Sequence, residues 1–215
     1  DGSAKYRLVL DVFEEVFGKD RILVDSSKSV NALRMLAGMP DVQLKVLYLI
    51  RDVRAWSTSC RDLDRRMGEL SAGDLLHRYG RDAGKEAFKR TMFQRFLQWY
   101  RGNRNIQQYL RKSNLPFFQL GYEELALQPA GMVDRICGFL GVEPAEGMLN
   151  LSESGSHVAV GNRMRLQKEK RAGIQYDSRW FWRREWLLPS LLLPPVMRYN
   201  AAEVYANLRP DLWTR

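Results

Sequence analysis

The chain is organised around a short apolar run, residues 45–50, that ends abruptly in the sequence Arg-Asp-x-Arg. The run contains β-branched and aromatic residues, which predicts a strand buried on both faces, as in a parallel sheet. A helical pattern follows, from about Arg54 to Arg66. Arg51 and Arg54 are therefore expected at the carboxyl end of a buried strand, the edge at which open α/β sheets bind ligands.

The side chains of Arg51 and Ser59 could together bind an anion such as a phosphate group. Ser59 follows Arg51 by about two helical turns. An arginine can grip a phosphate with two parallel hydrogen bonds, and a nearby hydroxyl adds another donor. The residues alone leave a structural alternative open, in which Arg51 caps the strand end and pairs with Asp52.

The rest of the chain alternates helical patterns with short apolar runs, which predicts a single α/β domain over residues 1–215 with a mainly parallel sheet. Loops are expected at 67–84 and 150–172, where glycines or charges interrupt the pattern. The predicted strands cover 21–25, 45–50 and 115–120, and the predicted helices cover 4–17, 30–37, 54–66, 86–112, 134–140, 176–186 and 196–208.

The net charge of +9 and the pI near 9.7 favour an anionic partner, such as a nucleotide, an acidic lipid, a polyanionic glycan or nucleic acid. Cys60 and Cys137 form no disulfide framework or zinc pattern, and His77 and His157 stand far apart, so no metal site is expected. No apolar run reaches the length of a membrane span, and residues 1–5 lack a signal-peptide core. These features favour a cytoplasmic location for a bacterial chain over the Golgi lumen.

Four stretches, in order, resemble the sulfotransferases that use 3′-phosphoadenosine 5′-phosphosulfate (PAPS). The segment Arg-Asp-x-Arg-(x)4-Ser at 51–59 resembles their 3′-phosphate motif, and Ile-Leu-Val-Asp-Ser-Ser-Lys-Ser at 22–29 resembles their acceptor-site strand and loop. Residues 118–142 resemble their "Tyr-Glu-Asp-Leu…Pro…Phe-Leu-Gly" block, and 156–165 resemble a later phosphate-side loop. The resemblance covers roughly residues 4–186.

The resemblance implies a three-layer sandwich around a mainly parallel sheet, of the P-loop nucleotide-binding type. It implies transfer of a sulfuryl group from PAPS to an acceptor hydroxyl. Arg51 and Ser59 are then expected to hold the 3′-phosphate. The loop containing Gly161, Asn162 and Arg165 is expected to close over this phosphate or the adenosine end.

The same resemblance places Asp25, Ser26 and Lys28 at the reactive sulfuryl group. A lysine there stabilises charge on the leaving oxygen, or acts as a base where its pKa is lowered. Asp25 would orient Lys28 or take the acceptor proton. From the residues alone, a solvated turn remains the alternative. The resemblance also makes Glu123 and Glu124 structural or acceptor-side residues that pair with basic side chains.

One part of the family pattern is missing. These enzymes carry a phosphosulfate-binding loop after a strand well upstream of the acceptor-site loop. The only similar stretch, 80–86, is one residue short of that loop pattern, lacks its Ser or Thr and follows no strand. Because the other motifs are intact, we expect an N-terminally incomplete chain without its first strand and loop, in preference to a degenerate relative without transferase activity.

The Leu-Ile-Arg-Asp and Tyr-Glu-Glu-Leu sequences resemble those of bacterial and carbohydrate sulfotransferases more than those of the phenol and steroid type. This resemblance favours a sugar, a glycolipid or another small hydroxylated metabolite as acceptor. Nucleic acid is not expected as a partner. The tryptophans and arginines of 176–199 favour packing, with peripheral membrane contact as the alternative. The alternative function is a non-catalytic basic α/β module that binds a nucleotide or a polyanion, with little nucleotide preference and a steep salt dependence.

Overall fold

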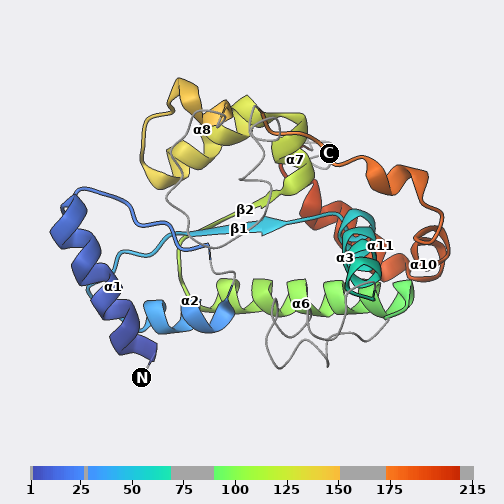
Figure 1. Ribbon diagram of the computed structural model, residues 1–215, viewed down its shortest axis with the longest axis horizontal. Helices are drawn as coiled ribbons and strands as arrows, with labels where there is room; N and C mark the ends of the chain where they lie inside the picture. Colours follow the sequence, from blue (N-terminus) through green and yellow to red (C-terminus); the bar gives the residue numbers. More distant parts are fainter. Residues whose placement is uncertain (1, 27–28, 69–89, 151–172, 209–215) are drawn as a thin grey trace, which may run out of the picture. The chain divides into compact units, whose positions relative to one another are not determined.

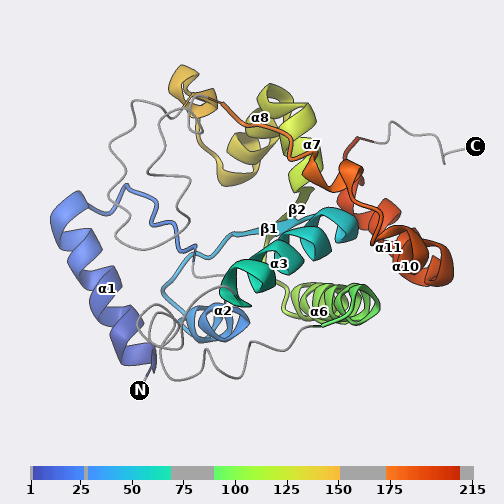
Figure 2. The ribbon, with the colours of Figure 1, turned by 45° about the vertical axis from the view of Figure 1, so that its right-hand side comes forward.

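The computed structural model describes residues 2–26, 29–68, 90–150 and 173–208. They form a mixed α/β structure with many helices and a small parallel sheet (Figures 1 and 2), as the sequence predicts. Contacts divide the chain into two units, which are Asp1–Val46 with Ile106–Phe117, and Leu47–Asn105 with Phe118–Arg215. The three-layer arrangement and the single domain stay predictions.

The sheet consists of β1 (Val46–Ile50) and β2 (Phe117–Gly121), which are neighbours. Side chains alternate between the two faces of a strand. Tyr48 and Ile50 are 8% and 1% exposed, whereas Leu47 and Leu49 are 41% and 53% exposed. The prediction of a strand buried on both faces is therefore wrong, because the described part of the chain covers only the face of Tyr48 and Ile50.

The first unit contains α1 (Gly2–Phe17) and α2 (Val30–Ala37), which contact each other. The helix α1 ends where predicted, because Gly18 adopts a φ of +84° and its N–H donates to the Glu14 carbonyl. The hydroxyl of Ser29 accepts a hydrogen bond from the Ala32 N–H at 3.2 Å and so caps α2. Local capping interactions thus set the end of α1 and the start of α2.

Residues 21–25, a predicted strand of the same unit, are not a strand. They have no regular secondary structure and pair with no strand among the described residues. Ile22, Leu23 and Val24 are 53%, 40% and 76% exposed. A strand needs a partner backbone for its N–H and C=O groups, and strand propensity alone does not supply one.

In the second unit, α3 (Val53–Gly68) follows β1 directly, as predicted. Its N-cap is Asp52, whose carboxylate accepts the Arg54 N–H at 2.8 Å. The helix α6 (Met92–Lys112) begins at a reciprocal pair of hydrogen bonds between Thr91 and Gln94. The predicted helix starts at 86, and residues 86–89 lie outside the described residues.

After β2 come α7 (Tyr122–Leu127), α8 (Pro129–Leu140) and the 3₁₀ helix η1 (Glu146–Leu149). The helix α8 starts earlier than the predicted 134, because Pro129 occupies its first turn, where a missing N–H has no cost. It ends at Gly141, as predicted, with a φ of +78°.

The described C-terminal segment forms the 3₁₀ helix η3 (Arg179–Trp182), α10 (Leu187–Leu192) and α11 (Pro194–Val204). The helix predicted at 176–186 is wrong. Only one 3₁₀ turn forms, and the backbone is extended again at Arg183. Pro194 starts α11 two residues before the predicted helix at 196–208.

Candidate functional site

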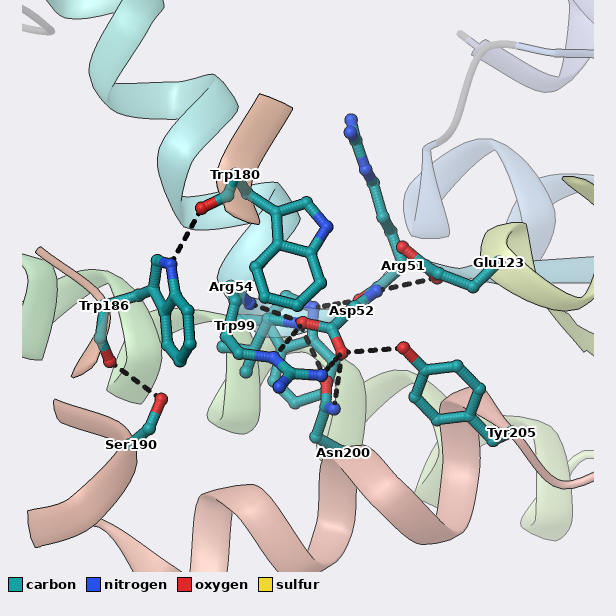
Figure 3. A network of polar contacts seen from close by, with 11 residues as sticks. Arg51, Asp52, Arg54, Trp99, Glu123, Trp180, Trp186, Ser190, Asn200 and Tyr205 are labelled. Atoms are coloured by element: carbon teal, nitrogen blue, oxygen red, sulfur yellow. Dashed lines mark hydrogen bonds and ion pairs between the residues drawn. The ribbon is translucent and has the colours of Figure 1, made fainter. Parts of the chain in front are cut away.

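Arg51 is fixed at the carboxyl end of β1 by its backbone neighbours. The indole N–H of Trp99 on α6 donates to the Arg51 carbonyl at 2.9 Å. The Asp52 N–H donates to the Glu123 carboxylate on α7 at 3.0 Å. Two elements therefore hold the chain where it leaves the strand, so Arg51 starts from a rigid base (Figure 3).

The Arg51 guanidinium is partly open, with 26% of its side chain exposed. Its Nη2 donates to Asp177 Oδ2 at 2.7 Å, and the group lies 5.0 Å from the centre of the Tyr122 ring. Its Nε is buried and has no hydrogen-bond partner in the described structure. The alternative pairing of Arg51 with Asp52 is wrong, since Figure 3 shows the Arg51 side chain directed away from that carboxylate.

The Asp52 carboxylate is fully buried and belongs to Arg54 instead. It accepts Arg54 Nη2 at 2.6 Å, and Asn200 and Tyr205 each at 2.9 Å. Burial acts to raise the pKa of Asp52, but the hydrogen bonds and charge of Arg54, with the bond from Asn200, outweigh it and lower the pKa. The Arg54 guanidinium also lies 4.4 Å from the Trp180 ring, so its N–H edge and one face are committed to the fold.

Glu123 and Glu124 are both buried. Burial, with a contribution from the nearby Asp52 charge, raises the pKa of Glu123 to about 7. Its Oε1 has no hydrogen-bond partner in the described chain, and its Oε2 holds the Asp52 N–H. Glu124 accepts the N–H groups of Gly121 at 2.8 Å and Leu208 at 3.0 Å.

The described hydrogen bonds of these two glutamates come from backbone N–H groups and the Asn207 side chain. Their pairing with basic residues stays a prediction. Each carboxylate satisfies donors at the end of another element. The structural role is therefore confirmed for Glu124, which ties the segment after α11 to the start of α7.

A family model described as a sulfotransferase domain matches residues 25–175, more than half of the chain. The chain belongs to the sulfotransferase family. Comparison with curated proteins and with solved structures finds no match. Family membership indicates a transferase that moves a sulfuryl group, and the match spans both the Arg51 motif and the Tyr-Glu-Glu-Leu segment.

The predicted site residues of this sulfotransferase are divided between the two units. Arg51 and Ser59 belong to the second unit, and Ser59 is half-buried on α3. Asp25 and Ser26 belong to the first unit and are exposed, with the Tyr6 hydroxyl 3.4 Å from Asp25 Oδ2. The remaining predicted residues, Lys28, Gly161, Asn162 and Arg165, lie outside the described residues.

The sequence did not identify several residues that contact the Arg51 motif. Tyr122 could have been found, because it follows the second strand, and the carboxyl ends of neighbouring parallel strands meet at one edge of the sheet. Asp177 lies 126 positions from Arg51, and Asn200 lies 148 positions from Asp52. No local pattern links residues at such separations.

Asp177, the acidic partner of Arg51, stays ionised at neutral pH. Hydrogen bonds from Arg179, and then from Arg51, hold the pKa of Asp177 well below its usual range, although partial burial opposes them. Among the described residues there is no cluster of three metal-ligating side chains.

Proposed function

We propose that this sulfotransferase takes its sulfuryl group from PAPS and that Arg51, with Ser59, holds the 3′-phosphate of the donor. The observation that supports this most is the Arg51 guanidinium. It follows the strand end in a 3′-phosphate-type motif, it is partly exposed, and its backbone is fixed from two sides.

The residues fit a phosphate group. The buried Nε of Arg51 has no acceptor among the described residues, and a phosphate oxygen would satisfy it. The Tyr122 ring faces the guanidinium and limits its rotation. Asp177 accepts a hydrogen bond from Nη2 of the same guanidinium, so its negative charge competes with a bound phosphate for Arg51. The family resemblance adds Gly161, Asn162 and Arg165, which lie outside the described residues, to the phosphate side of the proposed site.

In the proposed reaction the acceptor oxygen forms a bond to sulfur. The bond between sulfur and the bridging oxygen of the donor breaks, and 3′-phosphoadenosine 5′-phosphate (PAP) leaves. The acceptor hydroxyl loses its proton to Asp25 or to a neutral Lys28. A protonated Lys28 would instead stabilise the leaving oxygen, and Ser26 would position the acceptor.

For the acceptor we propose a sugar, a glycolipid or another small hydroxylated metabolite. This proposal is supported by the sequences of the Leu-Ile-Arg-Asp and Tyr-Glu-Glu-Leu segments, which resemble those of bacterial and carbohydrate sulfotransferases.

Calorimetric titration with PAP and with adenosine 5′-phosphate tests the donor assignment. Wild type should prefer PAP, because Arg51 binds the additional phosphate. Arg51→Ala should weaken PAP binding by about 10- to 100-fold, the equivalent of a lost charge-assisted hydrogen bond. The affinity for adenosine 5′-phosphate, which lacks the 3′-phosphate, should stay almost unchanged. Arg101→Ala removes the same charge from an exposed position on α6 and should change neither titration.

Equal affinity for the two nucleotides would refute the proposed role of Arg51. Weak binding of both nucleotides with a steep salt dependence would favour the non-catalytic polyanion-binding module.

A further inference from the structure

A continuous segment of the second unit exposes an unusual number of large apolar side chains. Its members, here called the apolar strip, are exposed to the following extents: Phe181 55%, Trp182 87%, Leu187 44%, Leu188 57%, Leu191 75% and Leu192 61%. Single exposed apolar residues are ordinary, but a contiguous group marks an interaction surface.

The strip is held in place by its buried neighbours. Trp180 is 3% exposed, and its carbonyl accepts the Trp186 indole N–H at 2.8 Å (Figure 3). Pro189, on the inner side of α10, is fully buried. The exposed side chains are therefore presented by an anchored segment, and α10 and α11 contact each other.

Arginines lie beside the strip in the sequence. Arg184 is exposed, and Arg179, which pairs with Asp177, keeps 70% of its side chain accessible. The one acidic residue of 179–192 is Glu185, whose carboxylate lies 3.5 Å from Arg61 and 3.7 Å from Arg65 on α3. Residues 177–192 thus carry three arginines against two carboxylates, a small basic excess that we call the basic rim, in a chain with a net charge of +9.

We propose that the apolar strip docks onto the surface of an anionic phospholipid bilayer. Leucines and an exposed tryptophan enter the boundary between headgroups and acyl chains, while arginines at the rim meet the lipid phosphates. A second copy of the chain fits less well, because it would bring the basic rims of two positively charged molecules together. Among the described residues, no helix is long and apolar enough to span a bilayer.

Co-sedimentation with vesicles tests the proposal, using phosphatidylcholine alone and phosphatidylcholine mixed with phosphatidylserine. Wild type should sediment with the mixed vesicles, and its binding should weaken as salt rises. Trp182→Ser combined with Leu191→Ser should reduce binding by about tenfold or more. The control, Leu127→Ser combined with Leu149→Ser, removes exposed apolar side chains outside the strip and should bind like wild type. Thermal unfolding of both variants should match wild type, because all four positions are exposed.

Three results would overturn the proposal. The first is no binding of wild type to the mixed vesicles, and the second is equal loss of binding in the test and control variants. The third is a dimer in solution that the Trp182 and Leu191 substitutions dissociate, which would make the strip an interface between copies. None of these results depends on nucleotide binding, so the test is independent of the proposed donor site.

Discussion

Glu123→Gln should remove a pH dependence from the stability of this sulfotransferase. Burial raises the pKa of Glu123 to about 7 in the folded chain, whereas the unfolded chain keeps an ordinary value near 4.5. Between these two values the folded state retains a proton that the unfolded state releases. The contribution of Glu123 to stability is therefore complete below about pH 4.5 and is lost as the pH rises to about 7.

The size of the effect follows from the shift in pKa. A shift of one unit corresponds to about 1.4 kcal/mol, so the change from 4.5 to about 7 corresponds to about 3 kcal/mol of unfolding free energy. Glutamine keeps an acceptor for the Asp52 N–H and cannot ionise. The difference in stability between variant and wild type should therefore move by about 3 kcal/mol in favour of the variant between pH 4 and pH 8.

Urea unfolding at several pH values measures this difference. Glu143→Gln, at an exposed position after α8, provides the matched control and should follow wild type at every pH. Parallel stability curves for Glu123→Gln and wild type would refute the reasoning, because they would show that this carboxyl group ionises alike in the folded and unfolded chains. A curve of opposite slope would place its folded pKa below the ordinary value.

Two further predictions concern Gly121 and Asp177. Gly121→Ala should destabilise the chain by about 3 kcal/mol, seen as a lower Tm, because the new Cβ would lie 1.8 Å from the Val204 carbonyl oxygen. Gly131→Ala, where a Cβ meets nothing within 4 Å, should not lower the Tm. Asp177→Asn should tighten PAP binding by up to about fivefold in calorimetry, because a partly exposed ion pair is worth up to about 1 kcal/mol and no longer competes for Arg51. Unchanged affinity would show that this pair does not oppose the phosphate.

The parts of the fold that follow local rules could be predicted from the sequence. Ser29 caps α2 through its own hydroxyl, and Gly18 and Gly141 end helices with positive φ angles. The position of β1 and the start of α3 follow from the change of an apolar run into Arg-Asp-x-Arg. These signals act within a few residues, so they can be recognised in the sequence without knowledge of tertiary contacts.

The secondary-structure predictions that were wrong concern segments whose conformation depends on residues far away in the sequence. The residues at 22–24 have strand propensity, but pairing requires a second backbone, which no local pattern specifies. Helical spacing at 180, 183/184 and 186/187 predicts a packed helix over 176–186. Only a 3₁₀ turn forms there, and it buries Trp180 while Trp182, two residues on and on another face, lies in solvent.

The two arginines of Arg-Asp-x-Arg have different roles, and the spacing of the motif explains why. Asp52 follows the strand, caps α3 and takes Arg54, one residue into the helix, as the partner of its buried charge. That pairing is closed from solvent by Asn200, Tyr205 and the Trp180 ring. The partner of Asp52 is thus supplied without Arg51, whose side chain leaves in the other direction toward a half-open position beside Asp177. Loss of Arg54 would leave a buried carboxylate unpaired and act on folding. Loss of Arg51 would leave Asp177 still paired with Arg179, so we expect it to act mainly on the proposed binding of the 3′-phosphate.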